Sequence, residues 1–203
     1  MKFLVTSFIT ALLVTCAVPV QSRQASGQSD IPAEEYAIYA AVIRDMFDGD
    51  KLYFDSQTKV KMVVIEDRTV RNGFVAIAKE DEGAKMMRNF TSLSQETIDD
   101  YVAKNAKSHQ LTNSLDLKLK YTLAPKEKIE QIFKIGWDEF YKQFPYSGGL
   151  IGLSRAGLNP GGNQAVVYIE HSCALLCGTG HYLLLVKNDR GWVVQHKFMA
   201  WIS

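Results

Sequence analysis

The last 59 residues constrain the fold of this chain more than any other feature. Residues 145–203 contain six charged side chains, whereas residues 23–144 contain 38. Four runs in this part are rich in β-branched and aromatic residues, and turns rich in Gly, Asn, Asp and Pro separate them. The four runs cover residues 150–157, 164–172, 181–187 and 192–202. Short connections between successive strands predict an antiparallel meander.

The central runs of this meander are apolar on both faces. Val167 and Ile169 would face one side of the sheet, and Val166 and Tyr168 the other. Such a sheet must be covered on both faces, or present one of them to a partner. A homodimer or another protein partner is therefore one interpretation of the low-charge sheet. In the last run, alternation with apolar residues predicts that His196 is a buried histidine of the core.

Amphipathic helices precede the sheet. Apolar residues recur at helical spacing in three stretches, with capping or breaking residues at their ends. These predicted helices cover 32–47, a stretch from a cap at Ser92 to about Lys107, and 126–144 with a potential break at Gly136. Residues 60–67 and 115–121 favour strands. We expect an α+β fold, with N-terminal amphipathic helices packed on a C-terminal antiparallel β-meander of about four strands.

The N-terminus has the features of a secretory signal. Lys2 precedes an uncharged apolar run over residues 3–20, and Gln21-Ser22 provides a cleavage point. We therefore expect residues 1–22 to be a signal peptide and the protein to be secreted or periplasmic.

The remaining chain divides simply. Residues 23–29 form a flexible polar segment, and residues 30–203 form a single α+β domain in this interpretation. Leu13 to Cys16 also looks like a degraded bacterial lipobox, so a lipid anchor at Cys16 and an envelope location are the alternative.

Two cysteines and two histidines form an H-x-C-x3-C-x3-H pattern from His171 through Cys173 and Cys177 to His181. Thiolate and imidazole are ligands that zinc prefers, so a zinc site is one interpretation. A disulfide between Cys173 and Cys177 is favoured, because exported proteins retain disulfides and zinc sites prefer a tighter spacing. Free thiols are the third alternative.

No group of residues in the sequence predicts catalysis. Gly152 to Ala156 is similar to a nucleophile elbow, but Ser154 lies in a strand-like run with no helix after it. We therefore assign no catalytic residue, metal or cofactor. A net charge of +1 gives no basis for nucleic-acid binding. The candidates for a ligand site are Ser154, Arg155, Tyr168, His171 and His181.

Several segments of the C-terminal part resemble a group of uncharacterised exported bacterial proteins with no assigned activity. The segments are LSRAGLN at 153–159, QAVVY at 164–168, C-x3-C-G-x-G-x-Y from Cys173, GWVV at 191–194 and WIS at 201–203. The likeness covers about the last 60 residues and implies export and a disulfide-bearing sheet. The paired strands ending in Gly-Trp-x-Val are also loosely similar to cone-shaped folds of the nuclear-transport-factor-2 type, an analogy that does not fix a function.

These observations favour a non-enzymatic binding or structural protein of the periplasm or cell surface. The alternative is a small-ligand-binding protein or a hydrolase with a pocket between the helices and the sheet, or a zinc site at His171, Cys173, Cys177 and His181.

Overall fold

A computed structural model describes residues 30–47, 60–71 and 90–203 of the chain. The predicted signal peptide, the flexible segment and Cys16 lie outside the described residues.

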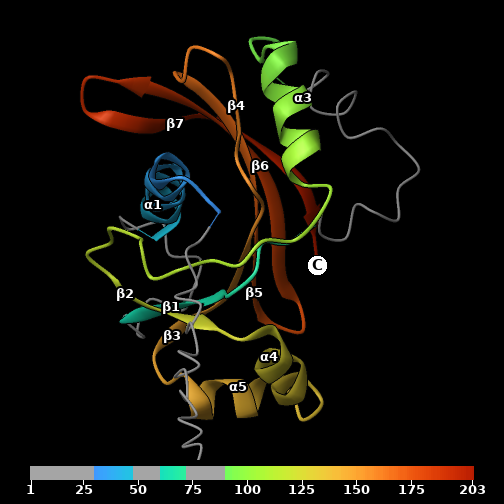
Figure 1. Ribbon diagram of the computed structural model, residues 1–203. Helices are drawn as coiled ribbons and strands as arrows, with labels where there is room; N and C mark the ends of the chain where they lie inside the picture. The colour runs from blue at the N-terminus through green and yellow to red at the C-terminus, as the bar shows by residue number, and fades with distance from the viewer. Residues whose placement is uncertain (1–29, 48–59, 72–89) are drawn as a thin grey trace, which may run out of the picture.

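One mixed seven-stranded sheet organises the molecule, with the strand order β2-β1-β3-β5-β6-β7 and β4 paired to β5 (Figure 1). The strands are β1 (Met62–Glu66), β2 (Lys120–Ala124), β3 (Ser147–Leu153), β4 (Gly157–Leu158), β5 (Gln164–Ala174), β6 (Cys177–Asn188) and β7 (Gly191–Ile202). Strands β5, β6 and β7 form the predicted antiparallel meander.

The α+β class is confirmed, but the prediction of about four antiparallel strands is too small. Strands β1 and β2, from the charged part of the chain, join the same sheet, and β1 pairs in parallel with both β2 and β3. A parallel pair needs a long crossover between its strands, so short-range patterns give no sign of it.

The helices cover both faces of the sheet. They are α1 (Ala33–Phe47), α3 (Gln95–Lys104), α4 (Lys126–Phe133) and α5 (Trp137–Gln143). Apolar residues of α1 pack with Ile65, Ile151 and Val167 on one face. Residues of α3 pack with Tyr168 on the other face, where α4 and α5 pack with Val64. No helix among the described residues is long and apolar enough to span a membrane.

The predicted helix break is confirmed, and the predicted helix cap lies two residues further along the chain. The break at Gly136 is confirmed: α4 ends before it, and Gly136 adopts a φ of 131° that favours glycine. The cap of α3 is Ser94, two residues after the predicted Ser92, and its hydroxyl accepts a hydrogen bond from Thr97 N.

The prediction that His196 is buried is wrong. Leu185 pairs with Val194 whereas Leu184 pairs with His196, so Gln195 is an extra residue in β7. Such a bulge shifts the alternation of a strand by one residue. Val194 therefore packs against the α1 face, while His196 lies beyond the shift and is exposed.

Candidate functional site

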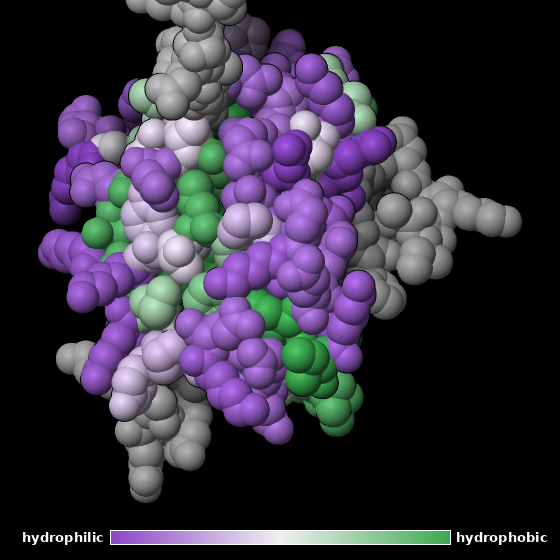
Figure 2. Space-filling view, turned by 60° about the horizontal axis from the view of Figure 1, so that its bottom comes forward, coloured by the Kyte–Doolittle hydropathy of each residue, from purple (hydrophilic) through white to green (hydrophobic). Residues whose placement is uncertain are grey.

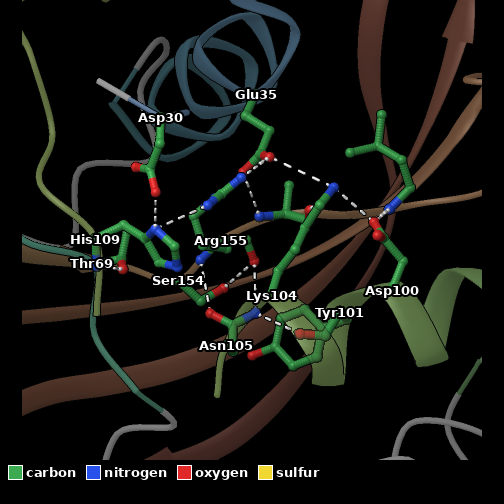
Figure 3. A network of polar contacts seen from close by, with 12 residues as sticks. Asp30, Glu35, Thr69, Asp100, Tyr101, Lys104, Asn105, His109, Ser154 and Arg155 are labelled. Carbon is green, nitrogen blue, oxygen red and sulfur yellow. Dashed lines mark hydrogen bonds and ion pairs between the residues drawn. The ribbon is translucent and has the colours of Figure 1, made fainter. Parts of the chain in front are cut away.

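Ser154, the serine of the elbow-like segment, is fully buried at the end of β3. Its hydroxyl donates to the Arg155 carbonyl at 2.9 Å and accepts from Tyr168 N at 2.9 Å. Both of these contacts are to backbone atoms, and no imidazole lies among its hydrogen-bond partners in the described part of the chain. Ser154 therefore fixes the chain after β3, as Figure 3 shows, rather than acting as a nucleophile.

Arg155 forms a buried, two-point ion pair with Glu35 of α1. Nη2 donates to Oε1 at 2.7 Å and Nε donates to Oε2 at 2.8 Å, and the side chains are only 6% and 1% exposed. The hydrogen bonds to Glu35 raise the pKa of Arg155 above its ordinary value. Ala156 N also donates to Glu35, so charge and hydrogen bonds are matched in this pair.

Polar groups from α3 and two loops surround this ion pair (Figure 3). Lys104 Nζ lies 3.5 Å from Glu35 and 2.7 Å from Asp100. Asn105 donates to the Arg155 carbonyl and accepts from Arg155 N. His109 Nδ1 lies 2.8 Å from Asp30, and this hydrogen bond lowers the pKa of Asp30. The network joins α1, α3 and the segment after β3. Its role is therefore structural.

His171 and His181 lie on the face of the sheet that α1 covers, away from Tyr168. The His171 Nε2–H donates to the Gly148 carbonyl at 2.5 Å, and the Phe47 ring meets the imidazole edge to face. Burial lowers the pKa of His171. The pKa of His181 is also lowered, first by burial and then by the charges of Lys197 and His171. Arg155 pairs with Glu35 near the start of α1, whereas His171 meets Phe47 at its end, so Arg155 and His171 lie at opposite ends of the helix.

The favoured disulfide is confirmed: Cys173 and Cys177 are bonded across the β5–β6 turn, with Cα atoms 5.2 Å apart. Neither sulfur is therefore free to act as a thiolate ligand or nucleophile. Within the described residues, no group of three or more His, Cys, Asp or Glu side chains is placed to hold a metal ion. The zinc alternative does not fit this arrangement.

Sequence reasoning missed two acidic residues that share one row across the sheet. Ile65 pairs with Ile151, which places Glu66 of β1 beside Gly152 of β3. Gly152 in turn pairs with Glu170 of β5. The row lies between the core under α3 and the core under α4 and α5, on the same face as both helical layers.

The absence of a side chain at Gly152 sets the position of Glu170. A Cβ at Gly152 would lie 2.9 Å from Cγ and from Oε1 of Glu170, and 2.6 Å from Val70 Cγ1. The Glu170 side chain therefore extends over Gly152, on the strand next to Glu66. Since real Cβ atoms do not approach this closely, only glycine permits this placement.

Both carboxyl groups in this row hold protons more tightly than usual. Burial, and then the charge of Glu170, raise the pKa of Glu66 to about 7. Burial also raises the pKa of Glu170, against the opposing hydrogen bond from Tyr168. Lys126 lowers the pKa of Glu66 without cancelling these effects. No hydrogen bond or ion pair joins the Glu66 carboxyl to another described residue.

Tyr168 is the one sequence candidate that belongs to this pair. Its buried hydroxyl donates to Glu170 Oε2 at 3.2 Å and accepts from Trp201 Nε1 at 2.6 Å. The arrangement orients Glu170 from β5 and β7 together. The sequence signal that could have identified the two glutamates is their rarity in their segments. Glu170 is one of two acidic residues in 145–203, and Glu66 is the one charged residue of β1.

Comparison with protein-family models, with curated proteins and with solved structures finds no match to this chain. The likeness to exported bacterial proteins therefore stays a prediction.

Proposed function

We propose that the protein is an exported, non-enzymatic binding domain that takes a small ligand with an ammonium group at Glu66 and Glu170. The observation that carries this proposal is the Glu66 carboxyl: it lies half-buried near a second carboxyl, without a hydrogen-bond or ion-pair partner among the described residues. Arg155, by contrast, is the cation that Glu35 requires.

An ammonium group supplies what the carboxyl pair lacks. Two like charges close together at a half-buried site repel. Burial first, and then the charge of Glu170, raise the pKa of Glu66, whereas burial raises that of Glu170. A ligand cation with three N–H donors can hydrogen-bond to both carboxylates and cancel the repulsion. Both side chains keep part of their surface in solvent, so a ligand can reach them.

The test uses 1,4-diaminobutane as the probe and 1,4-butanediol, its uncharged analogue, as the matched control. Binding to the purified protein is measured by calorimetry and by chemical shifts of the Glu66 and Glu170 side chains. We expect the diamine to bind and the diol not to. Since the cation replaces a proton on Glu66, affinity should rise as the pH increases from 6 to 8.

Variants assign the binding to the pair. Glu66→Gln and Glu170→Gln should each weaken diamine binding by at least about tenfold, through loss of a charge-assisted hydrogen bond. Glu127→Gln, which alters an exposed carboxyl on α4 that is not among the charges shifting the pKa of Glu66, is the control and should bind as the parent does. Equal affinity in all three variants, or equal binding of diol and diamine, would contradict the proposal.

Export has its own test. The intact mass of the protein recovered from a bacterial host should correspond to a chain beginning at Arg23. A mass that retains residues 1–22 would contradict export with cleavage, and a lipid on Cys16 would establish the anchored alternative.

A hydrolase is a second candidate for the same residues. One carboxyl that holds a proton near pH 7, beside another that can ionise, is the pairing that general acid–base catalysis uses. Slow consumption of a chromogenic ester or glycoside, abolished by both Glu66→Gln and Glu170→Gln but not by Glu127→Gln, would favour this candidate.

A further inference from the structure

The turn between β5 and β6 presents two leucines to solvent. Leu175 and Leu176 are each 87% exposed. They are the two residues of the turn, because Ala174 pairs with Cys177. Two-residue hairpin turns favour Asn, Asp and Gly. Leucine serves neither the turn nor the core at these positions, so its role lies outside the fold.

The tip of this hairpin is held from several sides. The disulfide between Cys173 and Cys177 closes the turn. The Tyr141 hydroxyl of α5 donates to the Cys173 carbonyl at 2.7 Å. At the base of the tip, Ser203 N donates to the Gly178 carbonyl at 2.9 Å. A tip fixed in this way loses little conformational freedom when its side chains bind.

The hairpin carries no charge near its tip. Residues 171–186 contain no Asp, Glu, Lys or Arg. Ile202, which pairs with Thr179 beside the tip, is 68% exposed and adds a third apolar side chain. Figure 2 brings the lower end of the view of Figure 1 forward and shows apolar atoms at several places on a mostly hydrophilic surface, one group of them at the lower right. An uncharged tip can leave water without the cost of desolvating an ion.

The size and shape of the tip decide between occupants. Two leucine side chains present on the order of 200 Å² of apolar surface. A stable protein interface buries roughly 800 Å² on each partner. A second copy of the chain would need much more contact than this convex turn offers. A bilayer accepts isolated apolar side chains and requires no complementary pocket.

We propose that the Leu175–Leu176 tip inserts into the interfacial layer of a phospholipid bilayer and attaches the protein to its surface. This attachment is separate from the ligand site at Glu66 and Glu170. Failure of either proposal leaves the other unaffected, because the two use different residues and different probes.

The test measures co-sedimentation of the protein with vesicles of phosphatidylcholine and phosphatidylglycerol at a 3:1 ratio. The double substitution Leu175→Ser with Leu176→Ser should lower the partition coefficient by at least about tenfold. Val102→Ser, which alters a 48% exposed residue of α3, is the control and should bind as the parent does. All variants share the same N-terminal residues, so their difference reports the tip alone.

Two further readouts complete the test. Binding should be insensitive to salt, because the tip is uncharged. The double variant should retain the melting temperature of the parent, since both side chains are exposed. Absence of vesicle binding in the parent, or equal binding by the double variant, would overturn the proposal. A dimer in sedimentation analysis that the double substitution dissolves would also overturn it, in favour of a second copy.

Discussion

Two groups of acidic residues in this molecule differ in what neutralises them. Glu35, only 1% exposed, meets the guanidinium of Arg155 in a two-point ion pair and accepts a further hydrogen bond from Ala156 N. Glu66 is half-buried, has another carboxyl near it, and is instead neutralised by a proton near pH 7. The fold supplies a cation where it needs rigidity. At the pair of Glu66 and Glu170, the missing cation is what we propose a ligand provides.

The largest effect is expected from breaking the complete ion pair. Arg155→Met removes the two-point guanidinium contact of the buried Glu35 carboxylate and leaves it only Lys104 Nζ at 3.5 Å, which costs about 3–5 kcal/mol of unfolding free energy. Urea unfolding at pH 7 measures this loss. Lys187→Met removes a cation from an exposed pair with Glu34 and should cost at most about 1 kcal/mol. Similar losses in the two variants would contradict a special role for the buried pair.

At the carboxyl pair, by contrast, we expect a substitution to raise the unfolding free energy. The pKa of Glu66 is about 7 in the folded chain against an ordinary value of 4.5. Its stabilising contribution is therefore complete below pH 4.5 and is lost as the pH rises through 7. Glu66→Gln should match the parent at pH 4 and exceed its unfolding free energy at pH 8 by up to about 3 kcal/mol. A variant less stable than the parent at pH 8 would contradict this account.

A smaller effect is expected from displacing Glu170. In Gly152→Ala, the new Cβ would meet the Glu170 side chain and Val70, which costs about 1–3 kcal/mol. As Glu170 moves away, the pKa of Glu66 should fall toward its ordinary value. Gly161→Ala is the matched control, because the nearest atom to its Cβ would be 3.5 Å away. Unfolding and carboxyl titration of both variants check the prediction.

The sequence predicts what neighbouring residues decide. The α+β class, the β5–β7 meander, the helix break at Gly136 and the disulfide all follow from short-range patterns. Contacts between segments that are distant in the chain could not be predicted from these short-range patterns. Glu66 and Glu170 are far apart in the chain and meet only because β3 lies between β1 and β5. The bulge at Gln195 likewise depends on the pairing of β6 with β7, so strict alternation misplaced His196.

In our proposal, Glu66 and Glu170 form an uncompensated carboxyl pair that takes up a cation. Its most direct measurement is a titration of both side-chain carboxyl carbons by NMR from pH 3 to 9, with and without 1,4-diaminobutane. We expect a midpoint near 7 for Glu66, a raised midpoint for Glu170, and a fall in both when the diamine is added. Midpoints near 4.5 for both groups, unchanged by the diamine, would contradict it.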